Sequence, residues 1–362
     1  EDYVWDTYGN HIIRTVLKNL SQLESDNIEL CDEYSSIVKD YGRRLLAWPQ
    51  FLDLPYSELT SGLLQILLKA LQRLDEKLLD AYIHKLLNEC FVNTSNIDYE
   101  GQSESSILPD AFMSKPVVIL LEICLEVSSS KLYTQIYAKC FVNKLERLSF
   151  MKNTNFAVQK LLTNCKEKVE FEAMFDELAE SYTSILEAGH SGVILTLGQT
   201  CKRLLSKQGS FVQNIMKTYN CYEPEARQIS IVHCLCKNMK YDDLENCKNE
   251  DLQTAKLNLH GTLMVQIMLE FNKPIKIVNS ILNYDSVDLK KLFCNRMGCH
   301  IADVYVQSKF VGEKSREKLF KKLQGTYQDL AADKYGSRTF EAIWNVASLK
   351  NLVFLESHLY KF

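Results

Sequence analysis

A short phrase recurs along the chain at intervals typical of stacked helical repeats. It has a polar or glycine lead-in, two variable residues, two apolar residues and one polar residue, and an apolar helical face follows it. We call the variable residues the first and second positions and the polar residue the fifth position. Copies begin at Asn10, Ser114, Asn155, Ser191, Thr262, Cys299 and Ser337. The intervals from 114 to 155 and 191 are 41 and 36 residues, and those from 262 to 299 and 337 are 37 and 38 residues. A fixed period of this size indicates stacked units.

Longer intervals are explained by weaker copies. The interval of 104 residues from 10 to 114 fits three units, and the 71 residues from 191 to 262 fit two units with one degenerate copy between them. Copies near 43 and 61, and near 191 and 209, are only 18 residues apart. One member of each pair therefore lies on the other helix of its unit, and the pattern within 43–61 and 191–227 leaves open which one.

The composition agrees with a helical fold. The 362 residues include only 13 Gly and 6 Pro, too few for the many turns of a sheet or barrel. We therefore predict an all-α, superhelical α-solenoid of about ten repeats, C- or U-shaped, forming a single domain over residues 1–362. A polar, Ser-rich stretch at about 93–109 predicts an insertion. The charged stretch 240–256 also resembles an insertion, and its pattern fits either a helix or a loop.

Several functional classes lack their signatures. There is no glycine-rich phosphate loop, HExxH or GxSxG motif, so we expect neither catalysis nor a cofactor. The 12 cysteines form no CxxC pair and predict buried thiols rather than a metal site. No apolar run reaches about 18 residues, so we expect no membrane span. The net charge of −4 predicts a local basic strip at most, not a basic domain.

The phrase itself indicates recognition of a flat molecule. Residues four apart on a helix share one face, so polar side chains at the first and fifth positions can hydrogen-bond one edge. A planar or long side chain at the second position can stack against a flat surface. A base of single-stranded RNA offers both an edge and a face. In a stacked array, such groups recur along one concave surface.

The phrase resembles the base-reading helix of PUF (Pumilio-type) repeats, which read one base per repeat. Asn155, Phe156 and Gln159 resemble the triplet that the family associates with uracil. Ser337, Arg338 and Glu341 resemble the guanine triplet, in which the glutamate accepts from the base and the arginine stacks. Several units are blank, including Ser114-Lys115-Val118 and Ser191-Gly192-Leu195.

The order and spacing of four segments resemble a divergent branch, the nucleolar protein nine family of ribosome-biogenesis factors. The segments are YGNHIIRTVL, the stretch from SKPVVILL to NFAVQKLL, SGVILTLGQTCKRL, and the stretch from MGCHIADV to FEAIW. The resemblance implies nucleolar residence and binding of pre-ribosomal RNA on the path to the small subunit (the 18S precursor), with restraint of premature processing. It implies single-stranded RNA as the partner, with structured RNA accepted at blank units, and admits ribosome-assembly proteins.

The candidate RNA-binding residues are those that keep a position of the phrase, together with two arginines expected next to a helix start. They are Asn10, His11, Arg14, Arg43, Arg44, Asn155, Phe156, Gln159, Thr262, Gln266, Cys299, His300, Asp303, Ser337, Arg338 and Glu341. Two other functions remain open at this point. One is a Pumilio-type regulator of messenger RNA, and the other is a protein-binding scaffold of the HEAT or armadillo kind.

Overall fold

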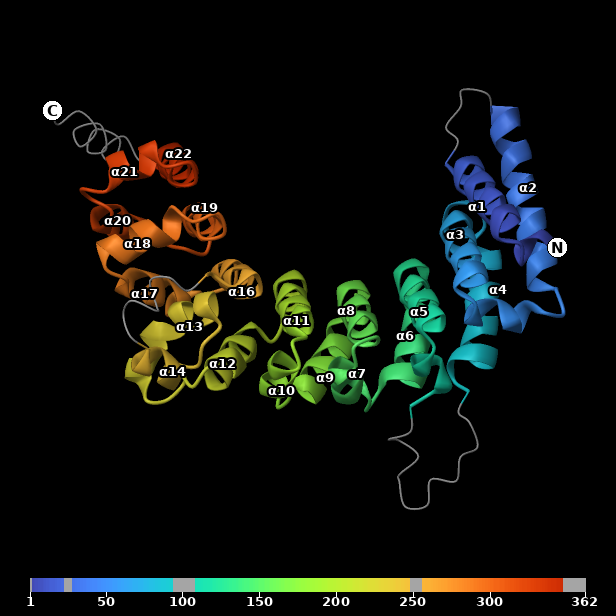
Figure 1. The fold of residues 1–362 in the computed structure, drawn as a ribbon, viewed down its shortest axis with the longest axis horizontal. Helices are drawn as coiled ribbons and strands as arrows, with labels where there is room; N and C mark the ends of the chain where they lie inside the picture. The colour runs from blue at the N-terminus through green and yellow to red at the C-terminus, as the bar shows by residue number, and fades with distance from the viewer. Residues whose placement is uncertain (1, 23–27, 94–107, 248–255, 348–362) are drawn as a thin grey trace, which may run out of the picture. The chain divides into compact units, whose positions relative to one another are not determined.

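The structure is a computed structural model that describes residues 2–22, 28–93, 108–247 and 256–347 (Figure 1). Over these residues it consists of helices and connecting turns, without strands, which confirms the all-α prediction. The chain divides into two compact units, residues 1–178 and 179–362. The single domain and the C or U shape stay predictions.

The phrase lies at the start of one helix in each repeat, which we call the central helix. In unit 1 the central helices are α1 (Thr7–Ser21), α3 (Glu58–Leu74), α5 (Lys115–Val127) and α8 (Asn155–Asn164). In unit 2 they are α11 (Ser191–Leu204), α16 (Leu259–Leu269), α19 (Cys299–Gln307) and α22 (Gly336–Val346). Each central helix begins at the first position of the phrase or within three residues of it.

A short helical segment precedes each central helix. These first helices are η1 (Asp2–Val4), η2 (Phe51–Tyr56), η5 (Asp110–Met113), α7 (Leu145–Phe150), α10 (Tyr182–Glu187), α13 (Ile231–Lys237), α18 (Ser286–Phe293) and α21 (Tyr327–Ala332). Within the described residues, a third helix follows each central helix from α1 to α19. The third helices are α2 (Ile28–Leu46), α4 (Glu76–Leu86) continued by η3 (Leu87–Phe91), α6 (Ser130–Ile136) continued by η6 (Tyr137–Phe141), α9 (Lys168–Leu178), α12 (Gln208–Thr218), α17 (Ile275–Asn283) and α20 (Glu313–Lys322).

Central helices pack on one another in chain order within each unit. The pairs in unit 1 are α1 with α3, α3 with α5, and α5 with α8, and those in unit 2 are α11 with α16, α16 with α19, and α19 with α22. Figure 1 shows α16, α19 and α22 along one side of unit 2, with α17, α18, α20 and α21 along the other. Apolar side chains between neighbouring central helices are buried. Leu63, Leu67 and Leu71 of α3 are examples. Each repeat therefore buries its apolar surface against its neighbours, as in a solenoid.

The lead-in residue of the phrase lies against a backbone carbonyl of the first helix. A Cβ atom added at Gly298 would lie 1.9 Å from the carbonyl oxygen of Leu292, and one at Gly261 would lie 1.9 Å from that of Leu235. Only a residue without a side chain allows this approach. At Thr154 the hydroxyl instead donates to the carbonyl of Leu148 over 2.6 Å. In these repeats the lead-in is therefore either glycine or a residue that can bond this carbonyl.

The described residues contain eight central helices, fewer than the predicted ten or so. The interval from 10 to 114 holds two long units, not three. One contains the 19-residue helix α2, and the other contains the predicted insertion. Residues 94–107 of that insertion lie outside the described residues, and the amide of Asp110 donates to the carbonyl of Asn93 across it, over 2.9 Å.

The interval from 191 to 262 holds one unit, because α11 packs directly on α16. The degenerate copy expected between them is therefore wrong. The extra length includes η7 (Glu225–Ser230) and the stretch that holds α14 (Tyr241–Asn246). The backbone N–H of Asn258 donates to the carbonyl of Cys236 over 2.7 Å and closes that stretch as an insertion. Part of it is thus helical, a point that the sequence left open; its residues 248–255 lie outside the described ones.

All twelve cysteines lie in the described residues, where nine are buried and none forms a disulfide, in line with the prediction of core thiols. In the part of the chain that the structure describes, no group of three or more His, Cys, Asp or Glu side chains is arranged to hold a metal ion. The same residues contain no helix that is both long and apolar enough to cross a membrane.

The close approach at the lead-in makes a testable prediction. We expect Gly298→Ala to lower the free energy of unfolding by about 3 kcal/mol, because the methyl group would overlap the Leu292 carbonyl and force α18 and α19 apart. Gly209→Ala in α12 is the matched control, since nothing lies within 4 Å of its added Cβ. The control should leave stability unchanged or raise it slightly. Equal melting temperatures for the two variants would contradict the role of this contact.

Candidate nucleic-acid interface

The three phrase residues of α8 form a polar pair beside an exposed ring. Gln159 donates its Nε2 to Oδ1 of Asn155 over 3.0 Å, and Asn155 donates its Nδ2 to the carbonyl of Lys152 over 2.8 Å. The Phe156 side chain between them is 57% exposed, although a phenylalanine without a partner is usually buried. The half-buried Gln159 amide keeps hydrogen-bonding capacity beyond this single bond. Because Asn155 is buried and orients Gln159, the accessible edge is that of the Gln159 amide, and it lies beside the stacking face of Phe156.

The same first-to-fifth hydrogen bond occurs in α3, at residues that are absent from the predicted set. Gln65 donates its Nε2 to Oγ of Ser61 over 3.2 Å, and Ser61 donates to the carbonyl of Pro116 in α5 over 2.9 Å. The sequence signal was present in the SGLLQ stretch, which has the spacing of the phrase. It was obscured because the copy at residue 43 competes with it. The structure places the copy at 61 on the central helix.

Arg43 and Arg44 do not lie next to a helix start, and that prediction is wrong. They occupy the last turn of α2, a third helix. Arg43 is 3.5 Å from Asp75, and Arg44 is 3.1 Å from Asp40 one turn earlier.

The structure also shows which of the copies at 191 and 209 lies on a central helix. Ser191 begins central helix α11, whereas Gly209 lies on third helix α12.

Four of the predicted first-position residues, Asn155 among them, are buried in their own repeats. Asn10 donates its Nδ2 to the carbonyl of Val4 over 2.8 Å. Thr262 donates its hydroxyl to the carbonyl of Leu259, also over 2.8 Å. Cys299 donates its thiol to the carbonyl of Arg296 over 3.4 Å. Each of them ties the start of its central helix to nearby backbone. Gln266, one turn after Thr262, is half-buried and donates to the Thr262 carbonyl over 3.2 Å.

The last two central helices are linked by an ion pair through their phrase residues. Arg338, at the second position of α22, donates Nε to Oδ2 of Asp303 over 2.7 Å, and Asp303 holds the fifth position of α19. His300 Nδ1 lies 3.4 Å from the same oxygen. The hydrogen bond to Asp303 raises the pKa of Arg338, so this exposed guanidinium stays charged. Asp303 thus faces two phrase residues rather than open solvent.

The remaining predicted residues are accessible. His11 at the second position of α1 and Glu341 at the fifth position of α22 are exposed. Ser337 is half-buried and donates to the carbonyl of Lys334 over 3.2 Å. Arg14, at the fifth position of α1, is half-buried and extends across to Gly62 of α3.

Acidic side chains follow the blank phrase of α5 along the same face. Glu122 and Glu126 come one and two turns after Val118. Lys69 of α3 and Lys160 of α8 approach the Glu126 carboxylate to 3.1 and 3.2 Å. In unit 2, Lys202 of α11 pairs with Glu270 at the end of α16. These lysines are therefore balanced by carboxylates on neighbouring repeats and do not form a continuous basic strip.

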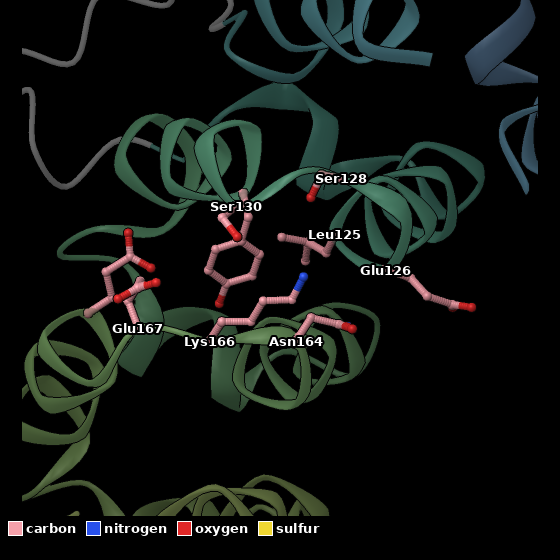
Figure 2. Close-up of a pocket in the computed structure, with 9 residues that line it drawn as sticks. Leu125, Glu126, Ser128, Ser130, Asn164, Lys166 and Glu167 are labelled. Carbon is pink, nitrogen blue, oxygen red and sulfur yellow. The ribbon is translucent and has the colours of Figure 1, made fainter. Parts of the chain in front are cut away.

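A small pocket lies near the ends of α5 and α8 (Figure 2). Leu125, Ser128, Tyr133 and Asn164 are among its lining residues, and its volume of about 20 Å³ is close to that of one water molecule. The Tyr133 hydroxyl donates to the carbonyl of Leu161 over 2.7 Å. The pocket is far too small for a nucleobase, so it belongs to the packing between repeats and not to the candidate interface.

Comparison with known proteins identifies relatives along nearly all of this chain. The model of a family described as the NOP9-like PUF repeat domain matches residues 50–359. The mouse protein named Nucleolar protein 9 is 27% identical over 386 residues, covering 95% of this chain and 59% of the mouse protein. Pumilio homolog 23 of Arabidopsis thaliana is 24% identical over 357 residues, covering 95% of this chain and 47% of its own length. The chain thus spans only about half to three fifths of these relatives.

Solved structures show the same fold. The structure named APUM23-GGAGUUGACGG superposes with a TM-score of 0.78 at 22% identity, covering 99% of this chain and 69% of that chain. PUF-8 in complex with PBE-RNA superposes with a TM-score of 0.53 at 13% identity, covering 98% of this chain and 85% of that chain. The arrangement of helices is therefore that of Pumilio repeat proteins.

The acidic face of α5 predicts a pH dependence of stability. Burial raises the pKa of Glu122 from 4.5 to about 7, and the Lys160 ammonium opposes part of this shift. Because the folded state favours the protonated form, stability falls as the pH rises from about 4.5 to about 7. We expect Glu122→Gln to be more stable than the wild type at pH 8 by about 1–2 kcal/mol, allowing for the partial exposure of the side chain, and nearly equal to it at pH 4.5.

Glu126→Gln is the matched control, one turn away on the same face. Burial acts to raise the pKa of Glu126, but hydrogen bonds from Lys69 and Lys160 lower it overall. This variant should therefore lose stability at pH 8 relative to the wild type. Thermal unfolding at both pH values measures the two effects. A Glu122→Gln variant that is less stable than the wild type at pH 8 would rule out the predicted burial effect.

Proposed function

The chain belongs to the family of NOP9-like PUF repeat proteins, and from this premise we propose that it binds single-stranded RNA on the face formed by its central helices. The observation that carries the proposal is the geometry of α8. Phe156 is exposed next to the hydrogen-bonded pair of Asn155 and Gln159. A base stacked on the ring would bring its edge to the amides. Base–aromatic stacking of this kind is a general source of affinity for single strands.

We further propose that the RNA is a precursor of small-subunit ribosomal RNA, the 18S precursor, and that binding takes place in the nucleolus. The resemblance to the nucleolar protein nine family and the names of the mouse and human relatives support this assignment. In this proposal, binding restrains premature processing of the precursor, and ribosome-assembly proteins are further partners. The role needs no catalytic group or cofactor. Where a unit lacks its readers, as α5 does, shape and backbone contacts hold the RNA and structured segments are accepted.

Charge pairing between repeats supports a binding mode led by bases. Lys69, Lys160 and Lys202 each pair with a carboxylate, which limits their availability for phosphate contacts. Phosphate contacts position RNA without reading its sequence, whereas contacts to base edges give specificity. We therefore expect a shallow dependence of affinity on salt, which is still measurable. A protein-binding scaffold would bind RNA with no such dependence or not at all.

The first test removes the edge groups of α8. Asn155→Ala combined with Gln159→Ala should weaken RNA binding by about 1–3 kcal/mol, the usual value of one good base contact. Fluorescence anisotropy with labelled pre-ribosomal RNA fragments measures the affinity. Gln213→Ala is the matched control, because it alters a Val-Gln pair on third helix α12. Unchanged affinity of the double variant for every fragment would contradict the assignment.

The second test identifies the RNA in cells. Ultraviolet crosslinking followed by sequencing of the bound RNA should recover small-subunit ribosomal precursors. Recovery of messenger RNAs with a short UGU-containing sequence would instead indicate a Pumilio-type regulator. Recovery of no RNA above the level of a non-binding control would indicate a protein scaffold.

A further inference from the structure

The Arg14 side chain rests flat on the backbone of the neighbouring repeat. A Cβ atom added at Gly62 would lie 3.0 Å from Nη1, 3.1 Å from Cζ and 3.3 Å from Nη2 of Arg14. These nearly equal distances mean that the plane of the guanidinium faces the Gly62 Cα atom. Gly62 is the second-position residue of α3, where other units carry a stacking side chain. The guanidinium of α1 therefore lies where a stacking side chain of α3 would otherwise lie.

The other end of the array shows the same adjacency with the groups exchanged. The fifth position of α19 is Asp303, and it bonds Arg338 at the second position of α22. In both pairs of helices, the fifth position of one central helix therefore meets the second position of the next. One guanidinium occupies this place in each pair. It comes from the fifth position between α1 and α3, and from the second position between α19 and α22.

We propose that Arg14 is the stacking group of the second repeat and not an edge reader of the first. This inference rests on the proposed RNA binding. A base held between exposed His11 and the Arg14 guanidinium would be stacked from both sides. Arginine suits this role because its planar, weakly hydrated group stacks on flat rings. Unlike Arg338, Arg14 forms no ion pair with any carboxylate of the described residues.

The slot formed in this way accepts any base. Asn10 is fully buried and its Nδ2 is bound to the Val4 carbonyl, so it presents no accessible group to a base edge. Arg14 is turned towards α3 and does not lie beside Asn10 as an edge reader would. The first repeat therefore contributes stacking affinity with little base preference. The ligand class is an unpaired nucleobase, purine or pyrimidine alike.

Three substitutions in the 362-residue chain test the proposal, with a pool of 12-nucleotide random-sequence RNAs as the probe. Arg14→Gln removes the guanidinium, Arg14→Lys keeps the charge without the plane, and Gly62→Ala keeps the arginine but places a methyl group where it rests. We expect each to weaken binding to the pool about tenfold, the scale of one stacked base. Sequencing of the bound RNA should show base preferences unchanged at every position. Arg73→Gln, an exposed arginine at the end of α3, is the matched charge control and should retain the wild-type affinity.

A fourth variant moves the guanidinium to the other helix. Arg14→Gln combined with Gly62→Arg reproduces the arrangement of Arg338 and should regain most of the lost affinity. Circular dichroism melting confirms that each variant is folded. Wild-type affinity of either Arg14→Gln or Arg14→Lys would overturn the proposal, and so would altered base preference at one position, which would make Arg14 an edge reader. A folded double variant that binds as weakly as Arg14→Gln would overturn the placement between α1 and α3.

The Asn155→Ala, Gln159→Ala variant separates this proposal from the function on which it rests. If that variant loses affinity for the pool and Arg14→Gln does not, the RNA-binding function stands and the role of Arg14 fails. If the wild-type chain itself does not bind the pool, the proposed function fails as well.

Discussion

In most repeats, a contact between the start of the central helix and a carbonyl of the preceding first helix determines where the phrase residues lie. Gly261 and Gly298 approach the carbonyls of Leu235 and Leu292 so closely that no side chain fits, and Thr154 bonds the equivalent carbonyl through its hydroxyl. The contact holds the two helices of a repeat in a fixed relation. Because of it, the first, second and fifth positions face the same side of each unit, and the apolar positions face the neighbouring repeats.

The same stacking that buries the leucines also brings charged groups of adjacent repeats together. Glu126 receives lysines from the repeats on both sides, and Asp303 holds Arg338 of the next repeat. These pairs neutralise some of the charges within the array. The net charge of −4 belongs to the whole chain, whereas the central helices themselves carry more basic than acidic residues, which is compatible with RNA binding. Affinity then also comes from planar groups and hydrogen bonds, which the exposed Phe156 and the Arg14 guanidinium can supply.

Much of the fold was predictable because the repeat signal is local. The spacing of the phrase placed the starts of α8, α19 and α22 correctly, and the scarcity of Gly and Pro agreed with an all-helical chain. The number of units was overestimated because interval length was taken to scale with repeat number. Long helix α2 lengthens the interval from 10 to 114, and the segments around η7 and α14 lengthen that from 191 to 262, without adding a central helix. For the same reason, Arg43 and Arg44 were placed at a helix start when they lie at a helix end.

The sequence by itself determined the helical class, the family and which side chains share a face, because the 3.6-residue period acts over a few neighbouring residues. The tertiary structure alone decided which residues of different repeats meet. Arg14 lies on Gly62 and Arg338 bonds Asp303 because helix crossings bring positions 48 and 35 residues apart into contact. The structure also showed that Asn10, Thr262 and Cys299 are buried while Phe156 is exposed. Burial depends on how neighbouring helices cover each position, and a pattern within one helix does not specify that cover.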